Sequence, residues 1–176
     1  MYTAIILDEE SRQELLRKYY EMHPLPPSGW ILKAHHVTLN MGEVYKETAA
    51  EGVSQVHPNM YGALCKVSVT SVLYKADGIE AVGVSVLCET GQRVRCVNAQ
   101  PHITIAHRGD VKPKTANDYP KSWLHARSAL YPQYLTGRIE VVEDTIRVRK
   151  TKTKGFVILD TSGTMTKADI EGIPTP

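Results

Sequence analysis

The chain has 176 residues, the length of one ordinary domain. With 42% apolar and 23% charged residues it can form a globular core, which excludes a disordered or low-complexity chain. The net charge of +2 is too small for a general nucleic-acid binder, so an anionic ligand would need a local site. No apolar run approaches the roughly 18 residues of a membrane span, and the first residues lack the features of a signal peptide. We therefore expect a cytoplasmic protein with no membrane partner.

The first 30 residues predict a strand, a helix and a loop. Residues 2–7 form a β-branched apolar run, and Asp8 is a plausible N-cap for a helix that extends through Tyr20. The buried stripe of this helix would consist of Leu15, Leu16 and Tyr19. The proline-rich segment 23–29 cannot continue the helix, because proline lacks the amide donor, and a strand can begin at Trp30.

The remainder of the chain indicates β-structure. Residues 66–74 and 79–87 alternate apolar and polar side chains around an Asp77-Gly78 turn, which predicts a hairpin. Further strands are expected at residues 102–107, 138–149 and 156–159, and a short helix near residues 123–130 within a long connection. The last residues lack an apolar period, so we expect one domain over residues 1–160 and a tail over residues 161–176.

The three cysteines are an odd number without C-x-x-C spacing, so reduced thiols are expected and a disulfide framework is not. Cys88, Cys96, His102 and His107 match no zinc spacing, and we expect neither a metal nor another cofactor.

One local pattern occurs twice. Ala-His-His-Val-Thr-Leu ends at Leu39, and Pro-His-Ile-Thr-Ile ends at Ile105; both contain His-x-Thr followed by an aliphatic residue in β-prone sequence. Because alternate side chains of a strand share a face, His36 and Thr38 would point together, away from the core. His102 and Thr104 would do the same, and strict alternation would place His107 on the opposite face from His102.

These residue types suit phosphodiester chemistry. Two imidazoles that face one site can provide a neutral general base and a protonated general acid at the same pH. Two threonine hydroxyls beside them can donate hydrogen bonds to the non-bridging oxygens of a phosphodiester. One His-x-Thr is a weak signal, whereas two copies in matching strand contexts are moderately specific.

With these two motifs the sequence resembles the 2H phosphoesterase superfamily, and the wording of the first motif is most similar to phage anti-CBASS phosphodiesterases, which destroy the cyclic-oligonucleotide signals of a bacterial defence. The resemblance covers roughly residues 1–150. It implies an α+β, bilobal fold in which two antiparallel sheets flank a central cleft and each lobe contributes one motif.

The resemblance also implies roles for individual residues. His36 and His102 would be catalytic, and Thr38 and Thr104 would bind phosphate, whereas His35 would have a supporting role because Val37 stands where a hydroxyl is needed. The family stacks aromatic residues on nucleobases, for which the candidates are Tyr45, Tyr119 and Trp123. Glu140 is a minority candidate for a ribose or base contact, since a solvated role is its default.

The function expected from the sequence is a metal-independent phosphodiesterase that cleaves a cyclic di- or trinucleotide in phage counter-defence, without an obligate protein partner. One alternative is a 2',3'-cyclic phosphodiesterase of RNA repair, with RNA as its substrate. A second is a non-catalytic module that binds a cyclic nucleotide or RNA, although binding alone would not require a matched acid and base.

Overall fold

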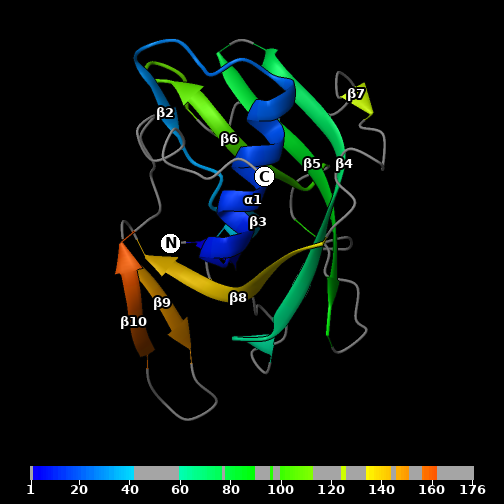
Figure 1. Cartoon of the computed structure of the whole chain (residues 1–176). Coiled ribbons are helices and arrows are strands. Elements are labelled where there is room, and N and C mark those ends of the chain that lie inside the picture. Colours follow the sequence, from blue (N-terminus) through cyan, green and yellow to red (C-terminus); the bar gives the residue numbers. More distant parts are fainter. Residues whose placement is uncertain are drawn as a thin grey trace.

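The computed structural model describes residues 2–41, 60–76, 78–89, 96, 100–112, 124–125, 134–143, 146–150 and 156–161. One helix, α1 (Glu9–Met22), follows the first strand (Figure 1). The strands are β1 (Tyr2–Leu7), β2 (Trp30–Leu32), β3 (His36–Met41), β4 (Leu64–Ala76), β5 (Ile79–Cys88), β6 (His102–Arg108), β7 (Leu124–His125), β8 (Leu135–Glu143), β9 (Ile146–Lys150) and β10 (Phe156–Thr161).

Six of these strands close into an antiparallel barrel. The order along the sheet is β8-β1-β3-β6-β5-β4, and a further pairing between β4 and β8 completes the ring. The expected α+β bilobal fold with two sheets is therefore wrong: the described chain is mostly β, with one helix. Both halves of the chain belong to one continuous hydrogen-bonded wall, so no boundary divides the sheet into two lobes.

The predicted helix is confirmed and extends two residues further, to Met22. The Asp8 side chain accepts a hydrogen bond from the backbone N–H of Ser11 at 2.8 Å, as an N-cap does. Leu15, Leu16 and Tyr19 are buried in the main core. Among the described residues, no helix has the length and apolar character needed to cross a membrane.

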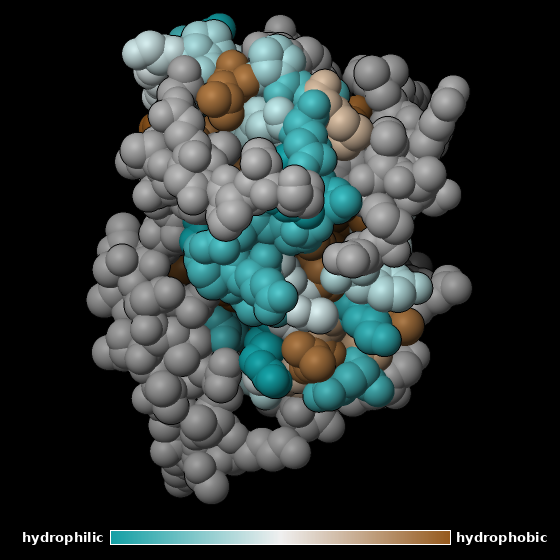
Figure 2. Space-filling view, in the orientation of Figure 1, coloured by the Kyte–Doolittle hydropathy of each residue, from teal (hydrophilic) through white to brown (hydrophobic). Residues whose placement is uncertain are grey.

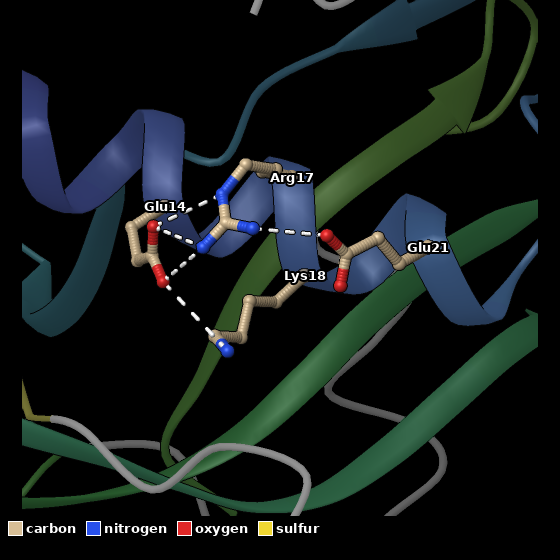
Figure 3. A network of polar contacts seen from close by, with 4 residues as sticks. All are labelled: Glu14, Arg17, Lys18 and Glu21. Carbon is tan, nitrogen blue, oxygen red and sulfur yellow. Dashed lines mark hydrogen bonds and ion pairs between the residues drawn. The ribbon is translucent and has the colours of Figure 1, made fainter. Parts of the chain in front are cut away.

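The opposite side of α1 is hydrophilic, as the band in the middle of Figure 2 shows. There Arg17 forms ion pairs with Glu14 at 2.6 Å and Glu21 at 2.9 Å, and Lys18 lies 3.9 Å from Glu14 (Figure 3). Such partly exposed pairs add little to stability.

The predicted hairpin is confirmed as β4 and β5, and Gly78 has the positive φ, 82°, that its turn requires. In this hairpin Cys65 lies opposite Cys88, with the sulfur atoms of the two free cysteines 2.7 Å apart.

Two expectations for the second half were wrong in detail. The predicted strand 138–149 is two strands, β8 and β9, which pair with each other. The helix expected near residues 123–130 is contradicted at its start, where β7 pairs with β4. The strand predicted at 156–159 is present as β10, and residues 162–176 of the expected tail lie outside the described residues.

The barrel strands have two distinct faces. The core face carries the apolar side chains that pack with the helix; on the motif strands these are Val37, Leu39, Ile103 and Ile105. We call the other side the outer face. A small separate cluster of Tyr2, Ala4, Ile6 and Val142 lies there, on β1 and β8.

Candidate functional site

The two His-x-Thr motifs lie on neighbouring strands. β3 and β6 are antiparallel and pair through the central residue of each motif. This register places His36 beside Thr104 and Thr38 beside His102. The structure thus brings the four predicted residues together on the outer face, in one wall of the barrel.

The chain turns sharply before the first motif. Ala34 has φ 48°, in the left-handed region that a non-glycine residue enters at an energetic cost. Arg12 of α1 holds this turn, because its Nε donates to the Ala34 carbonyl at 3.2 Å and its Nη2 to the Lys33 carbonyl at 3.1 Å. On the other side, the N–H groups of Lys33 and Ala34 donate to β6 at 2.7 and 2.8 Å. The turn is fixed between helix and sheet, and it leaves His35 buried and His36 partly exposed.

The second motif is held differently. His102 Nδ1 lies 2.8 Å from the backbone carbonyl of Gln100, which can only accept, so Nδ1 carries a proton and Nε2 is left for a ligand. The side chain of Gln100 donates to the Pro101 carbonyl at 2.9 Å. Gly83 is the β5 partner of His102, and Ser71 is the β4 partner of Gly83. Ser71 Oγ and the Gln100 amide both lie over Gly83, in the space that a side chain there would fill.

Burial is the main reason that the pKa of His36 falls to about 4, and the positive charges of Lys33 and His102 lower it further. Burial also lowers the pKa of His102, while its hydrogen bond to Gln100 acts in the opposite direction. His36 is therefore the histidine that is more readily neutral, because the charges of Lys33 and His102 add to the effect of burial, whereas at His102 the hydrogen bond opposes it.

An aromatic ring borders the site on the β1 side. The rings of Tyr2 and His36 lie with centroids 5.0 Å apart. Burial raises the pKa of Tyr2 to about 12, so its hydroxyl stays protonated over the physiological range. Tyr2 thus limits how the His36 ring can move and cannot serve as a base near neutral pH.

Of the four predicted substrate-binding residues, the structure describes only Glu140. Glu140 is the β8 partner of Ala4, which in turn pairs with Thr38, so Glu140 lies on the outer face in line with the site, although it is only 3% exposed. Tyr45, Tyr119 and Trp123 lie outside the described residues. Their predicted base-stacking role stays a prediction.

The expectation for His107 was wrong. Ile105 and Ala106 both face the core, because the β5–β6 register shifts between Ala81 and Glu80 and leaves Ile105 as an extra residue. His107 therefore lies on the outer face, three residues beyond Thr104. Within the described part of the chain, no three histidine, cysteine or acidic residues gather in a way that could hold a metal ion.

Sequence reasoning missed the residues that support the motifs. Arg12 lies three residues before Leu15 and so falls within the apolar stripe of the helix, which is a readable sign of a buried charge. Gln100 acts through its backbone carbonyl, and that function leaves no trace in residue type. In the sequence, Tyr2 does not differ from the rest of its β-prone run.

A family model described as the fungal tRNA ligase phosphodiesterase domain matches residues 31–144, a span that contains both motifs. Among solved structures, a crystal structure of a fungal RNA kinase aligns with a TM-score of 0.45 at 17% sequence identity. The alignment covers 78% of this chain and 45% of the other, so the chain spans less than half of that structure's length. No curated protein sequence matches the chain.

Proposed function

We propose that this chain, which belongs to the family of the fungal tRNA ligase phosphodiesterase domain, hydrolyses a 2',3'-cyclic phosphate at the end of an RNA. The observation that carries the proposal is the pairing of two His-x-Thr strands, which sets two imidazoles and two hydroxyls on one face. The family name favours this RNA reading, the alternative drawn from the sequence, over a cyclic di- or trinucleotide signal. Nothing in the comparisons supports phage counter-defence.

In the proposed reaction His36 is the general base. Its Nε2 takes a proton from water, and the water oxygen forms a new bond to phosphorus. The bond from phosphorus to one ribose oxygen breaks, and His102 gives a proton to that oxygen, so the product is a phosphomonoester beside a free hydroxyl. This assignment follows from the pKa values: burial and the charges of Lys33 and His102 lower the pKa of His36 to about 4, whereas at His102 the hydrogen bond to Gln100 opposes the effect of burial.

Thr38 and Thr104 are proposed to donate their hydroxyl protons to the non-bridging phosphate oxygens. Each lies beside the histidine of the other strand, so a phosphate between the two strands would contact both kinds of group. Lys33 supplies a positive charge close to His36, which suits an anionic ligand on a protein of small net charge.

The test is a panel of substrates incubated with the protein and resolved by chromatography. It contains a short RNA that ends in a 2',3'-cyclic phosphate, the same RNA with a 3'-phosphate, and cyclic di- and trinucleotides. We expect multiple turnovers on the cyclic-phosphate RNA, and none on the 3'-phosphate, which has no phosphodiester at its end. Turnover of cyclic oligonucleotides alone would restore the counter-defence reading, and stoichiometric depletion without product would indicate a binding module.

A further inference from the structure

His35 is in direct contact with the proposed base. Its Nδ1 lies 3.1 Å from Nδ1 of His36, and the two rings are nearly perpendicular, at 84°. His35 is 3% exposed, whereas His36 is partly exposed on the outer face. The two histidines therefore form a pair in which one ring is enclosed and the other reaches the site.

The contact between two Nδ1 atoms restricts where the protons lie. A hydrogen bond between them needs a proton on one nitrogen and a lone pair on the other. If His35 donates, the neutral ring of His36 carries its own proton on Nε2 and cannot act as a base there. If His36 donates, its Nε2 bears the lone pair that faces the site.

Only the arrangement in which His36 donates is compatible with both protonation states that His36 has in the reaction. When Nε2 of His36 accepts a proton, the ring becomes an imidazolium with N–H groups at both nitrogens. Its Nδ1–H can then still donate to Nδ1 of His35, provided that His35 is neutral and carries its own proton on Nε2. The other arrangement would set two N–H groups against each other.

We propose that His35 is a positioning residue that accepts a hydrogen bond from Nδ1 of His36 and thereby holds the ring with Nε2 as the bare nitrogen at the site. The proposal deepens the proposed function and rests on it for its kinetic consequence. It gives both motif histidines the same support, since the Gln100 carbonyl accepts from Nδ1 of His102. In the second motif Pro101 precedes the histidine, so a backbone carbonyl takes the place of a side chain there.

The backbone before the pair fits this role. The left-handed turn at Ala34 immediately precedes the two histidines whose Nδ1 atoms meet. The carbonyl of His35 also accepts the Leu7 N–H at 3.0 Å, and Arg12 bonds the turn from the other side. An unfavourable conformation that is held from several directions is common where geometry matters for function.

The experiment compares His35→Leu with His35→Asn. Leucine removes the acceptor, whereas asparagine keeps a polar atom close to the position of Nδ1. We expect His35→Leu to lower kcat on the cyclic-phosphate RNA roughly tenfold or more with KM nearly unchanged, because the group that orients the catalytic histidine is lost. His35→Asn should retain most of the activity, because its side-chain oxygen can accept the hydrogen bond from Nδ1 of His36. His107→Leu is the matched control, because His107 is also buried and hydrogen-bonded through Nδ1 to a backbone carbonyl. The kcat of this variant should equal that of the unchanged protein.

A second readout does not depend on activity. Nitrogen-15 NMR of the histidine rings reports which nitrogen is protonated, and we expect His36 in the unchanged protein to carry its proton on Nδ1, a preference that His35→Leu abolishes. A proton on Nε2 of His36, or equal kcat losses in the leucine and asparagine variants, would overturn the proposal. If no substrate of the panel is cleaved, the proposed function fails, while the NMR comparison still decides the role of His35.

Discussion

Gly83 offers a steric test of the site from the strand behind it. A β-carbon at this position would overlap Ser71 Oγ and would lie 2.9 Å from Gln100 Nε2, well inside ordinary contact distance. The Gln100 amide can swing aside, but Ser71 is 3% exposed and its hydroxyl is buried. We therefore expect Gly83→Ala to be an overpacking substitution whose cost comes mainly from Ser71.

The magnitude follows from two opposing effects. Overpacking typically costs about 1–3 kcal/mol, while replacing glycine by alanine at a compatible backbone position stabilises by about 0.4–1 kcal/mol through the unfolded chain. The net loss should be about 1–2 kcal/mol, or a fall of about 2–8 °C in Tm for a chain of this size. Ser71→Ala should cost nothing, because no described residue hydrogen-bonds its buried hydroxyl.

The decisive measurement is a double-mutant cycle by urea denaturation. The Gly83→Ala/Ser71→Ala double variant should be at least as stable as the unchanged protein. The overlap with Ser71 Oγ is gone, and alanine still stabilises the protein by restricting the unfolded chain. Ser85→Ala, which removes an exposed hydroxyl from the same strand, is the control and should have no effect. Additive losses in the double variant would refute the reasoning.

Four further outcomes are expected. His36→Ala and His102→Ala should each reduce turnover by roughly 100-fold or more, and the double variant should lose little beyond that, because both residues act in one step; full activity in either single variant would contradict the assignment. Activity should persist in EDTA, and loss restored by a divalent metal would disprove the metal-independent mechanism. The pH optimum of kcat/KM should lie on the acidic side of neutral, because the base His36 stays neutral down to about pH 4 and the acid His102, whose pKa is lowered, is already neutral at pH 7 in a larger fraction than an ordinary histidine. An alkaline optimum would argue against these roles. Gly137→Ala should destabilise the protein by about 3 kcal/mol or more, since its β-carbon would lie 2.5 Å from the Ile6 carbonyl, and an unchanged midpoint in urea would show that the backbone there can yield.

The stability of the protein should also depend on His36. Its pKa of about 4 in the folded state lies below the ordinary value near 6.5 of the unfolded chain. As pH falls from about 6.5 towards 4, the unfolded chain takes up a proton that the folded chain does not, so stability present at neutral pH is lost over this window. His36→Gln should flatten the dependence of Tm on pH there, and an unaltered slope would mean that other groups cause it.

Local signals in the sequence were sufficient for the elements that hold the motifs. Asp8 marks the start of the helix, and the prolines of segment 23–29 mark its end. The alternation around Val37 and Ile103 predicted two strands, each with its histidine and threonine on one face. These features depend on neighbours in the chain, where backbone sterics and side-chain period act directly.

Tertiary structure alone decided how the strands join and what supports the histidines. The pairing of β4 with β8 turns an expected pair of sheets into one barrel, and strand pairings so distant in sequence leave no local signal. The extra residue at Ile105 moves His107 to the outer face, because a single bulge reverses every later side chain. Arg12 holds the turn before the first motif, and the Gln100 carbonyl accepts a hydrogen bond from His102. Neither group belongs to a motif, because the orientation of a side chain is set by whatever packs against it in three dimensions.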